Sequence, residues 1–280
     1  TGLGMAKLPA AAAAAAKTQD LKPSPALGLI AKAKPTLDGR SIAILVADGS
    51  DGAQVAALRK AAEAAGASVK LVAPKLQVTL KDGKTVAGLM PLMSPEQPPV
   101  WSSYISVTDA DATTKLVRDN GGAVYAEPMD VGTLGRMAVF ADPVGAVIGV
   151  WQPGEHVGAQ TIDSEGTFTW TELATRDQAT ALPFYAAVFG WTAQATADYT
   201  EFQQDGKSVA GCMDMPPMVP AEVPSYWMPY FAASDPDAKA TQAAELGGTI
   251  LVPGMDFPGG RFSVVQDPHG STFGLLALKT

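Results

Sequence analysis

Two segments of the chain share one pattern and decide the fold: WSSYISVTDADATTKLVRDNGGAVYAEPMDVGTLGRMAVFADPVGAVIGVW at residues 101–151 and WMPYFAASDPDAKATQAAELGGTILVPGMDFPGGRFSVVQDPHGSTFGLLAL at residues 227–278. Trp101 aligns with Trp227 at an offset of 126 residues. The other matched positions are Tyr104 and Tyr230, Asp109 and Asp235, Gly121–Gly122 and Gly247–Gly248, Arg136 and Arg261, and Asp142–Pro143 and Asp267–Pro268. Self-similarity of this length indicates a repeated supersecondary unit.

Each repeat reads as a strand, a helix and three further strands. Apolar residues alternate over 226–233, a helical pattern over 235–247 is closed by a glycine pair, and Gly and Pro turns separate strand patterns at 249–255, 261–266 and 271–278. Residues 167–215 follow the same order, and DGKTVAGLM at 82–90 recurs as DGKSVAGCM at 205–213. We therefore expect four βαβββ modules, at about 36–92, 98–153, 166–222 and 224–280.

Composition limits the class of protein. A chain of 280 residues that is 47% hydrophobic can bury a sizeable core, and a formal charge of −8 makes nucleic acid and an anionic membrane poor partners. The longest apolar runs fall short of a membrane span. The single cysteine, Cys212, cannot form an intramolecular disulfide, which fits a cytoplasmic protein, and two histidines exclude a multi-histidine metal site.

The modules resemble a known superfamily. Each has an aspartate after its first strand, one helix carries Phe184, Tyr185 and Gly190 in the pattern FY-x-x-x-x-G, and D-P-x-G turns occur at 142–145 and 267–270. These motifs resemble the vicinal oxygen chelate superfamily, which includes glyoxalase I, extradiol dioxygenases and bleomycin-resistance proteins, over about residues 82–280. The resemblance implies an α+β fold in which βαβββ modules pair into two domains.

The first 85 residues resemble something else. KPSPALGLIAKAKPTLDGRSIAILVADGSDGAQVAALRKAAEAAGASVKLVAP at 22–74 resembles the linker and opening βαβ of the C-terminal domain of large-subunit catalases, a resemblance that does not imply catalase activity. We expect an Ala/Pro/Lys-rich linker at 1–35, a hybrid first domain at 36–155 and a second domain at 156–280. In the hybrid domain the catalase-like segment replaces the first module and joins the sheet of the second; the alternative is that it packs separately.

The resemblance also permits a test for a metal site. Enzymes of the superfamily usually hold a divalent metal with a His or Gln seven residues before the first-strand aspartate and a Glu four residues after the Gly of D-P-x-G. The first position is held here by Trp170, Met228 and Ser102, and the second by Gly149 and Gly274. None of these is a usual ligand for a hard divalent metal. We therefore expect no metal and no cofactor.

One acid and several apolar residues remain as candidates for the site. Trp170 and Glu172 lie two residues apart on one predicted strand, as do Met228 and Tyr230, so all four could face one cavity. The favoured interpretation is a metal-independent binding protein for a small organic molecule, with these four as ligand-binding residues. One alternative is a lyase or hydroxylase-like enzyme with Glu172 as base and Tyr230 as hydrogen-bond donor; in another, Glu172 only satisfies a buried hydrogen bond.

The remaining alternatives concern assembly. The chain could be a structural appendage derived from a catalase C-terminal domain. A homodimer through a sheet edge is also compatible with the sequence, because a first domain with an unusual composition would have unusual edges.

Overall fold

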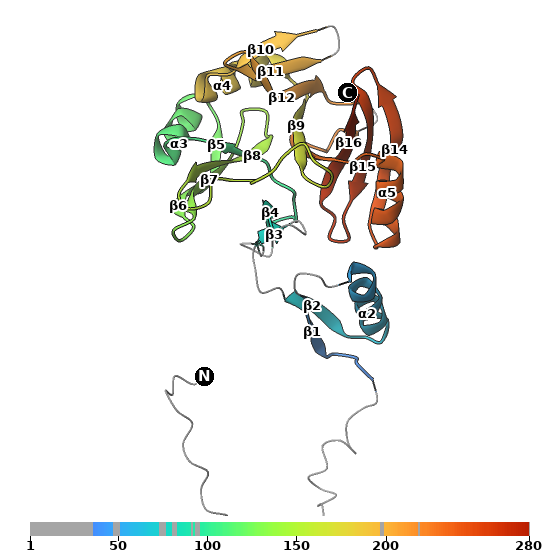
Figure 1. Cartoon of the computed structure of the whole chain (residues 1–280). Helices are drawn as coiled ribbons and strands as arrows, with labels where there is room; N and C mark the ends of the chain where they lie inside the picture. The colour runs from blue at the N-terminus through green and yellow to red at the C-terminus, as the bar shows by residue number, and fades with distance from the viewer. Residues whose placement is uncertain are drawn as a thin grey trace, which may run out of the picture.

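The computed structural model describes residues 36–46, 51–72, 77–79, 83–90, 92, 96–196, 199–217 and 219–279 (Figure 1). The predicted linker at 1–35 lies outside the described residues. No helix within these ranges is long and apolar enough to cross a membrane.

The last two modules form one sheet, as the tandem pattern predicts. Its eight strands run in the order β10-β11-β12-β9-β13-β16-β15-β14, and the antiparallel pair β9 and β13 joins the two modules. The first of them comprises β9 (Phe168–Thr175), α4 (Gln178–Phe189), β10 (Thr192–Ala195), β11 (Thr200–Gln204) and β12 (Lys207–Asp214). The second comprises β13 (Tyr226–Ala232), α5 (Pro236–Glu245), β14 (Thr249–Phe257), β15 (Gly260–Gln266) and β16 (Thr272–Leu278).

The second module has the same order but its own sheet. It comprises β5 (Tyr104–Ser106), α3 (Ala110–Asp119), β6 (Ala123–Asp130), β7 (Gly135–Ala141) and β8 (Val147–Pro153), and its strands run β5-β8-β7-β6. This order copies β13-β16-β15-β14 of the fourth module. The repeat seen in the sequence is therefore a repeat of topology.

The prediction that the catalase-like segment joins the sheet of the second module is wrong. Its elements follow the predicted chain order: β1 (Ser41–Leu45), α2 (Gly52–Ala64), β2 (Ser68–Val72), β3 (Gln77–Thr79) and β4 (Thr85–Gly88). However, β1 pairs in parallel with β2, and β3 pairs with β4, in two separate two-stranded sheets. The helix supplies the crossover that a parallel pair requires, so β1, α2 and β2 form a βαβ unit of their own.

An aspartate begins each module helix. The helices α3, α4 and α5 follow directly after an aspartate whose side chain accepts a backbone N–H bond from the residue three positions on: Asp109 from Ala112, Asp177 from Thr180 and Asp235 from Ala238. Such caps satisfy one of the N–H groups that a helix start leaves without an intrahelical acceptor. The first-strand aspartate of the superfamily pattern is therefore a helix cap here.

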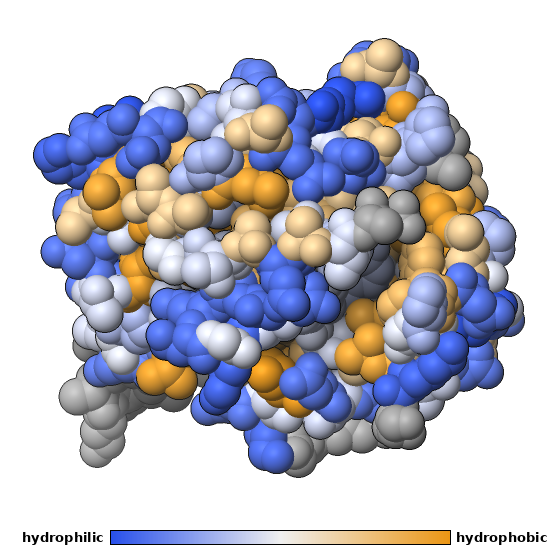
Figure 2. Space-filling view, turned by 90° about the horizontal axis from the view of Figure 1, so that it is seen from above, coloured by the Kyte–Doolittle hydropathy of each residue, from blue (hydrophilic) through white to orange (hydrophobic). Residues whose placement is uncertain are grey.

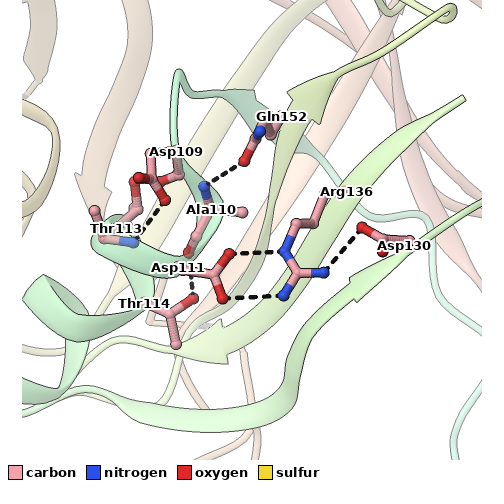
Figure 3. Close-up of polar contacts among 9 residues, drawn as sticks. Asp109, Ala110, Asp111, Thr113, Thr114, Asp130, Arg136 and Gln152 are labelled. Atoms are coloured by element: carbon pink, nitrogen blue, oxygen red, sulfur yellow. Dashed lines mark hydrogen bonds and ion pairs between the residues drawn. The ribbon is translucent and has the colours of Figure 1, made fainter. Parts of the chain in front are cut away.

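The repeated arginine ties helix to sheet in two modules. Arg136 on β7 forms a two-pronged contact with Asp111 on α3, at 2.7 and 3.0 Å, and bonds Asp130 on β6 at 2.9 Å (Figure 3). Arg261 repeats this arrangement with Asp237 and Asp256 in the fourth module. These exposed pairs add little free energy in water, but they fix how each helix lies on its sheet.

One core joins the second, third and fourth modules. Figure 1 shows α3 and α4 side by side, and buried apolar residues from both helices, from β7 and β8 and from β9 and β12 form one cluster that includes Trp227. Within it the Tyr185 hydroxyl donates to Asp142 at 2.9 Å and accepts from the Trp227 indole N–H at 2.7 Å. The predicted domain boundary at residue 155 therefore stays a proposal. It would separate two sheets that share one core.

Candidate functional site

The structure brings the four predicted site residues together. Trp170 and Glu172 lie on the face of the eight-stranded sheet opposite α4 and α5, which we call the helix-free face; Leu173, on the other face of the same strand, lies in the core. Across the β9–β13 pair, Tyr230 is opposite Trp170 and Met228 is opposite Glu172. The two-residue spacing on each strand and the antiparallel register together produce this cluster.

Two tyrosines hold the carboxylate of Glu172. The Tyr230 hydroxyl donates to Glu172 Oε1 at 3.3 Å. The Tyr199 hydroxyl also bonds Glu172, and it accepts from the Trp170 indole N–H at 2.9 Å. An ionised carboxylate has room for about four hydrogen bonds, so Glu172 keeps acceptor capacity for a ligand.

Burial controls the titration of this cluster. Burial raises the pKa of Glu172 above its ordinary value, and the hydrogen bonds from Tyr199 and Tyr230 offset part of that rise. The pKa of each of the two tyrosines is also raised, first by burial and then by the nearby Glu172 charge. Both hydroxyls therefore stay protonated and act as donors.

Two glycines make room for the tyrosines. A Cβ on Gly211 of β12 would lie 1.7 Å from the Tyr199 hydroxyl oxygen and 3.1 Å from the Trp170 indole nitrogen. A Cβ on Gly274 of β16 would lie 2.0 Å from Tyr230 Cδ1. Neither position can carry a side chain unless the neighbouring tyrosine moves. The strands on both sides of the β9–β13 pair are thus shaped around the aromatic rings.

Sequence reasoning missed Tyr199, which precedes β11 and belongs to neither repeated strand pattern. A signal for it was present in Gly211, because a glycine inside a strand often marks the close approach of another group. Gly149 and Gly274 are the equivalent positions of the second and fourth modules, where the superfamily resemblance implies a metal-binding Glu. The structure shows that they are spaces occupied by Tyr104 and Tyr230.

The residues at the expected metal positions do not fit a metal. Gly274 occupies a position where the superfamily resemblance implies a Glu, and the Tyr230 ring fills the space that such a side chain would need. The nearest groups to Glu172 are phenol, indole and thioether side chains, which are poor partners for a hard divalent cation. Among the described residues no group of three His, Cys, Asp or Glu side chains could hold an ion.

Two other residues are placed away from the site. Cys212 is fully buried in the core, where burial raises its pKa to about 12, so its thiol stays protonated and unreactive. His269 lies exposed in the turn between β15 and β16, where its backbone N–H donates to Asp267.

Replacing Glu172 by glutamine should change how stability depends on pH. Because the pKa of Glu172 is raised on folding, the folded state holds this proton to higher pH than the unfolded chain does, and ionisation costs stability as pH rises through the raised value. We expect Glu172→Gln to gain unfolding free energy relative to wild type at neutral pH, and to lose that advantage below the ordinary Glu pKa.

Urea unfolding at a series of pH values measures this difference, with Glu245→Gln at the exposed end of α5 as the matched control. An advantage that stays constant from acid to neutral pH would contradict a raised pKa.

Comparison with known proteins places these features in context. Residues 167–275 match the family described as Glyoxalase/Bleomycin resistance protein/Dioxygenase superfamily. The chain is 40% identical over 204 residues to "Putative glyoxylase CFP32" of Mycobacterium tuberculosis (strain CDC 1551 / Oshkosh), an alignment that covers 70% of this chain and 77% of that protein. It is 39% identical over 186 residues to "Anthracycline biosynthesis protein DnrV" of Streptomyces peucetius, covering 65% of this chain and 67% of that protein.

A third relative is a catalase. The chain is 31% identical over 179 residues to "Catalase C" of Rhizobium meliloti (strain 1021), covering 61% of this chain but 23% of that protein. The aligned stretch is longer than 85 residues, so part of it lies in the repeated modules.

Proposed function

Because the chain belongs to the glyoxalase/bleomycin resistance/dioxygenase superfamily, we propose that it is a metal-independent protein that binds a small organic molecule on the helix-free face at Glu172. The observation that carries this proposal is a carboxylate held by Tyr199 and Tyr230 with acceptor capacity to spare. Burying an ionised carboxylate costs free energy unless hydrogen-bond donors or an opposite charge compensate it. A ligand that donates a hydrogen bond to Glu172 lowers that cost.

The surroundings of Glu172 suggest the chemistry of the ligand. Trp170 and Tyr199, which are both half-buried, present aromatic surface beside the carboxylate, and the half-buried Met228 adds an adaptable apolar contact. A flat aromatic molecule with a hydroxyl group would stack on the rings and donate to Glu172. The similarity to a protein named for anthracycline biosynthesis supports hydroxylated polycyclic aromatics as the first class to test.

The proposal can be tested by titrating 1,4-dihydroxyanthraquinone into protein from which metal has been removed with a chelator. Tryptophan fluorescence reports the binding. We expect saturable quenching by wild type and an affinity lower by about tenfold or more in Glu172→Gln, since hydrogen bonds to charged groups are worth about 1.5–3 kcal/mol. Trp170→Phe should reduce the quenching amplitude, and Glu245→Gln should bind like wild type. Equal affinity in Glu172→Gln, or binding only with added metal, would contradict the proposal.

A second candidate function is catalysis at the same site. The raised pKa of Glu172 and the adjacent Tyr230 hydroxyl favour a general base beside a hydrogen-bond donor. The same variant separates the two functions. Substrate turnover that is lost in Glu172→Gln while binding is retained indicates an enzyme, whereas weaker binding without any turnover in wild type indicates a binding protein.

A further inference from the structure

Two acids lie in one row across the helix-free face. Glu201 on β11 is opposite Gly211 on β12, and Gly211 is in turn opposite Glu172 on β9. Residues that are directly opposite in a sheet point to the same face. Neighbouring strands lie about 4.8 Å apart, so the backbones of the two acids are about 10 Å apart along this row. The Tyr199 hydroxyl end occupies the space over Gly211, between them.

The two acids lack a cationic partner in the described part of the chain. None of the ion pairs found between described residues includes Glu172 or Glu201. Burial raises the pKa of Glu172, and only the hydrogen bonds from Tyr199 and Tyr230 offset that rise. Burial and then the charges of Glu172 and Glu201 raise the pKa of Tyr199, so both acids act on the same ring. The site therefore holds negative charge that a bound group can neutralise.

Aromatic rings border the Glu172 carboxylate. Trp170, Tyr199 and Tyr226 are all half-buried, so each leaves part of its surface open to solvent. Tyr226 lies two residues before Met228 on β13, and burial and then the Glu172 charge raise its pKa. The face of an aromatic ring attracts a cation, and rings gathered around an acid recognise ammonium groups.

The charge of the whole molecule acts in the same direction. Seen from above, hydrophilic residues are interspersed with hydrophobic ones over the surface (Figure 2). The charged residues of 91–280 are mostly acidic: 8 Lys and Arg against 22 Asp and Glu give a net charge of 8 − 22 = −14. Such a field raises the local concentration of cations and lowers that of anions. A cationic ligand is therefore favoured before it touches the site.

We propose that the ligand of this site carries an ammonium group, which pairs with Glu172 beside the rings of Trp170, Tyr199 and Tyr226. This inference rests on the proposed function, and it adds a cationic amine to the flat aromatic ligand argued there. An ammonium group brings a positive charge as well as three donors, so it compensates a buried carboxylate more fully than a neutral hydroxyl does. Glu201 adds attraction at longer range.

Two anthraquinones that differ in one group test this inference on the full chain. At neutral pH 1-(2-aminoethylamino)anthraquinone carries an ammonium group, and 1-(2-hydroxyethylamino)anthraquinone carries a neutral hydroxyl in its place. Titration followed by tryptophan fluorescence gives both dissociation constants. We expect wild type to bind the amine at least about tenfold more tightly, because a hydrogen bond between two charged groups is stronger than one from a neutral donor.

Three variants assign this preference to its source. Glu172→Gln keeps the shape of the side chain but not its charge, so it should bind the two compounds with equal affinity. Tyr226→Leu should weaken the amine by about threefold or more and the hydroxyl compound less, because only the amine loses a cation–π contact. Glu245→Gln, at the exposed end of α5, should keep the wild-type preference. Circular dichroism checks that each variant is folded.

The outcomes separate this inference from the proposed function. Equal affinity of wild type for the two compounds would overturn the ammonium assignment and leave the proposed function in place. A preference for the amine that survives in Glu172→Gln would also overturn it, because the preference would then come from the overall charge. Binding of neither compound to wild type would overturn both.

Discussion

Replacing Gly211 by alanine is expected to lower the affinity for 1,4-dihydroxyanthraquinone by at least about tenfold. The new Cβ would lie 1.7 Å from the Tyr199 hydroxyl oxygen and 2.4 Å from Cζ of that ring, so the ring must leave its place. Trp170 then loses its acceptor and Glu172 loses one of its two donors. Fluorescence titration of the purified variant measures the loss.

The cost in stability should be smaller than the cost in binding, about 1–2 kcal/mol, because the clash is with the far end of a half-buried side chain. Ser208→Ala on the same strand controls for changes in β12. Tyr199→Phe should weaken binding without the clash. Wild-type affinity in Gly211→Ala would show that the hydrogen bonds linking Trp170, Tyr199 and Glu172 are not needed to bind the ligand.

Replacing Tyr185 by phenylalanine is expected to cost about 2–4 kcal/mol of unfolding free energy, because the buried Trp227 indole N–H loses its acceptor and Asp142 Oδ2 loses its donor. Tyr185 is fully buried, and its hydroxyl is the donor to Asp142 and the acceptor for Trp227. Burial already raises the pKa of Asp142, and loss of the Tyr185 bond should raise it further. Urea unfolding at neutral pH measures the loss.

The matched control is Tyr125→Phe, which removes a hydroxyl from an exposed ring on β6 and should change stability by less than about 0.5 kcal/mol. A double-mutant cycle with Asp142→Asn isolates the coupling between the two residues. A Tyr185→Phe variant as stable as wild type would contradict the conclusion that this network joins three modules.

The repeated modules could be predicted from sequence because several local signals agree in each. In the fourth module the alternation over 226–233 predicts β13, the aspartate cap begins α5, and Gly247–Gly248 ends it. The pairing of β1 could not be predicted in the same way. Residues 41–45 indicate a strand but not its partner, and the short α2 crossover brings β2, rather than β5, beside it.

The candidate site was only partly predictable, for a similar reason. The first strands of the third and fourth modules, β9 and β13, pair with each other. The two site residues on each strand, Trp170 and Glu172 on β9 and Met228 and Tyr230 on β13, therefore lie opposite one another. Tyr199 reaches Glu172 from outside the repeated strands, and its position depends on the space that Gly211 leaves. A contact of this kind depends on which side chain crosses to a neighbouring strand, which periodicity does not encode.

Elemental analysis of the purified chain, after incubation with Fe(II), Zn(II), Mn(II) and Ni(II) and removal of free ions, tests whether the site at Glu172 is independent of metal. We expect far less than one metal per chain for every ion, because Tyr230 fills the space over Gly274 and the neighbours of Glu172 are phenol, indole and thioether groups. About one tightly held metal per chain, lost in Glu172→Gln, would show instead that this site is a metal centre.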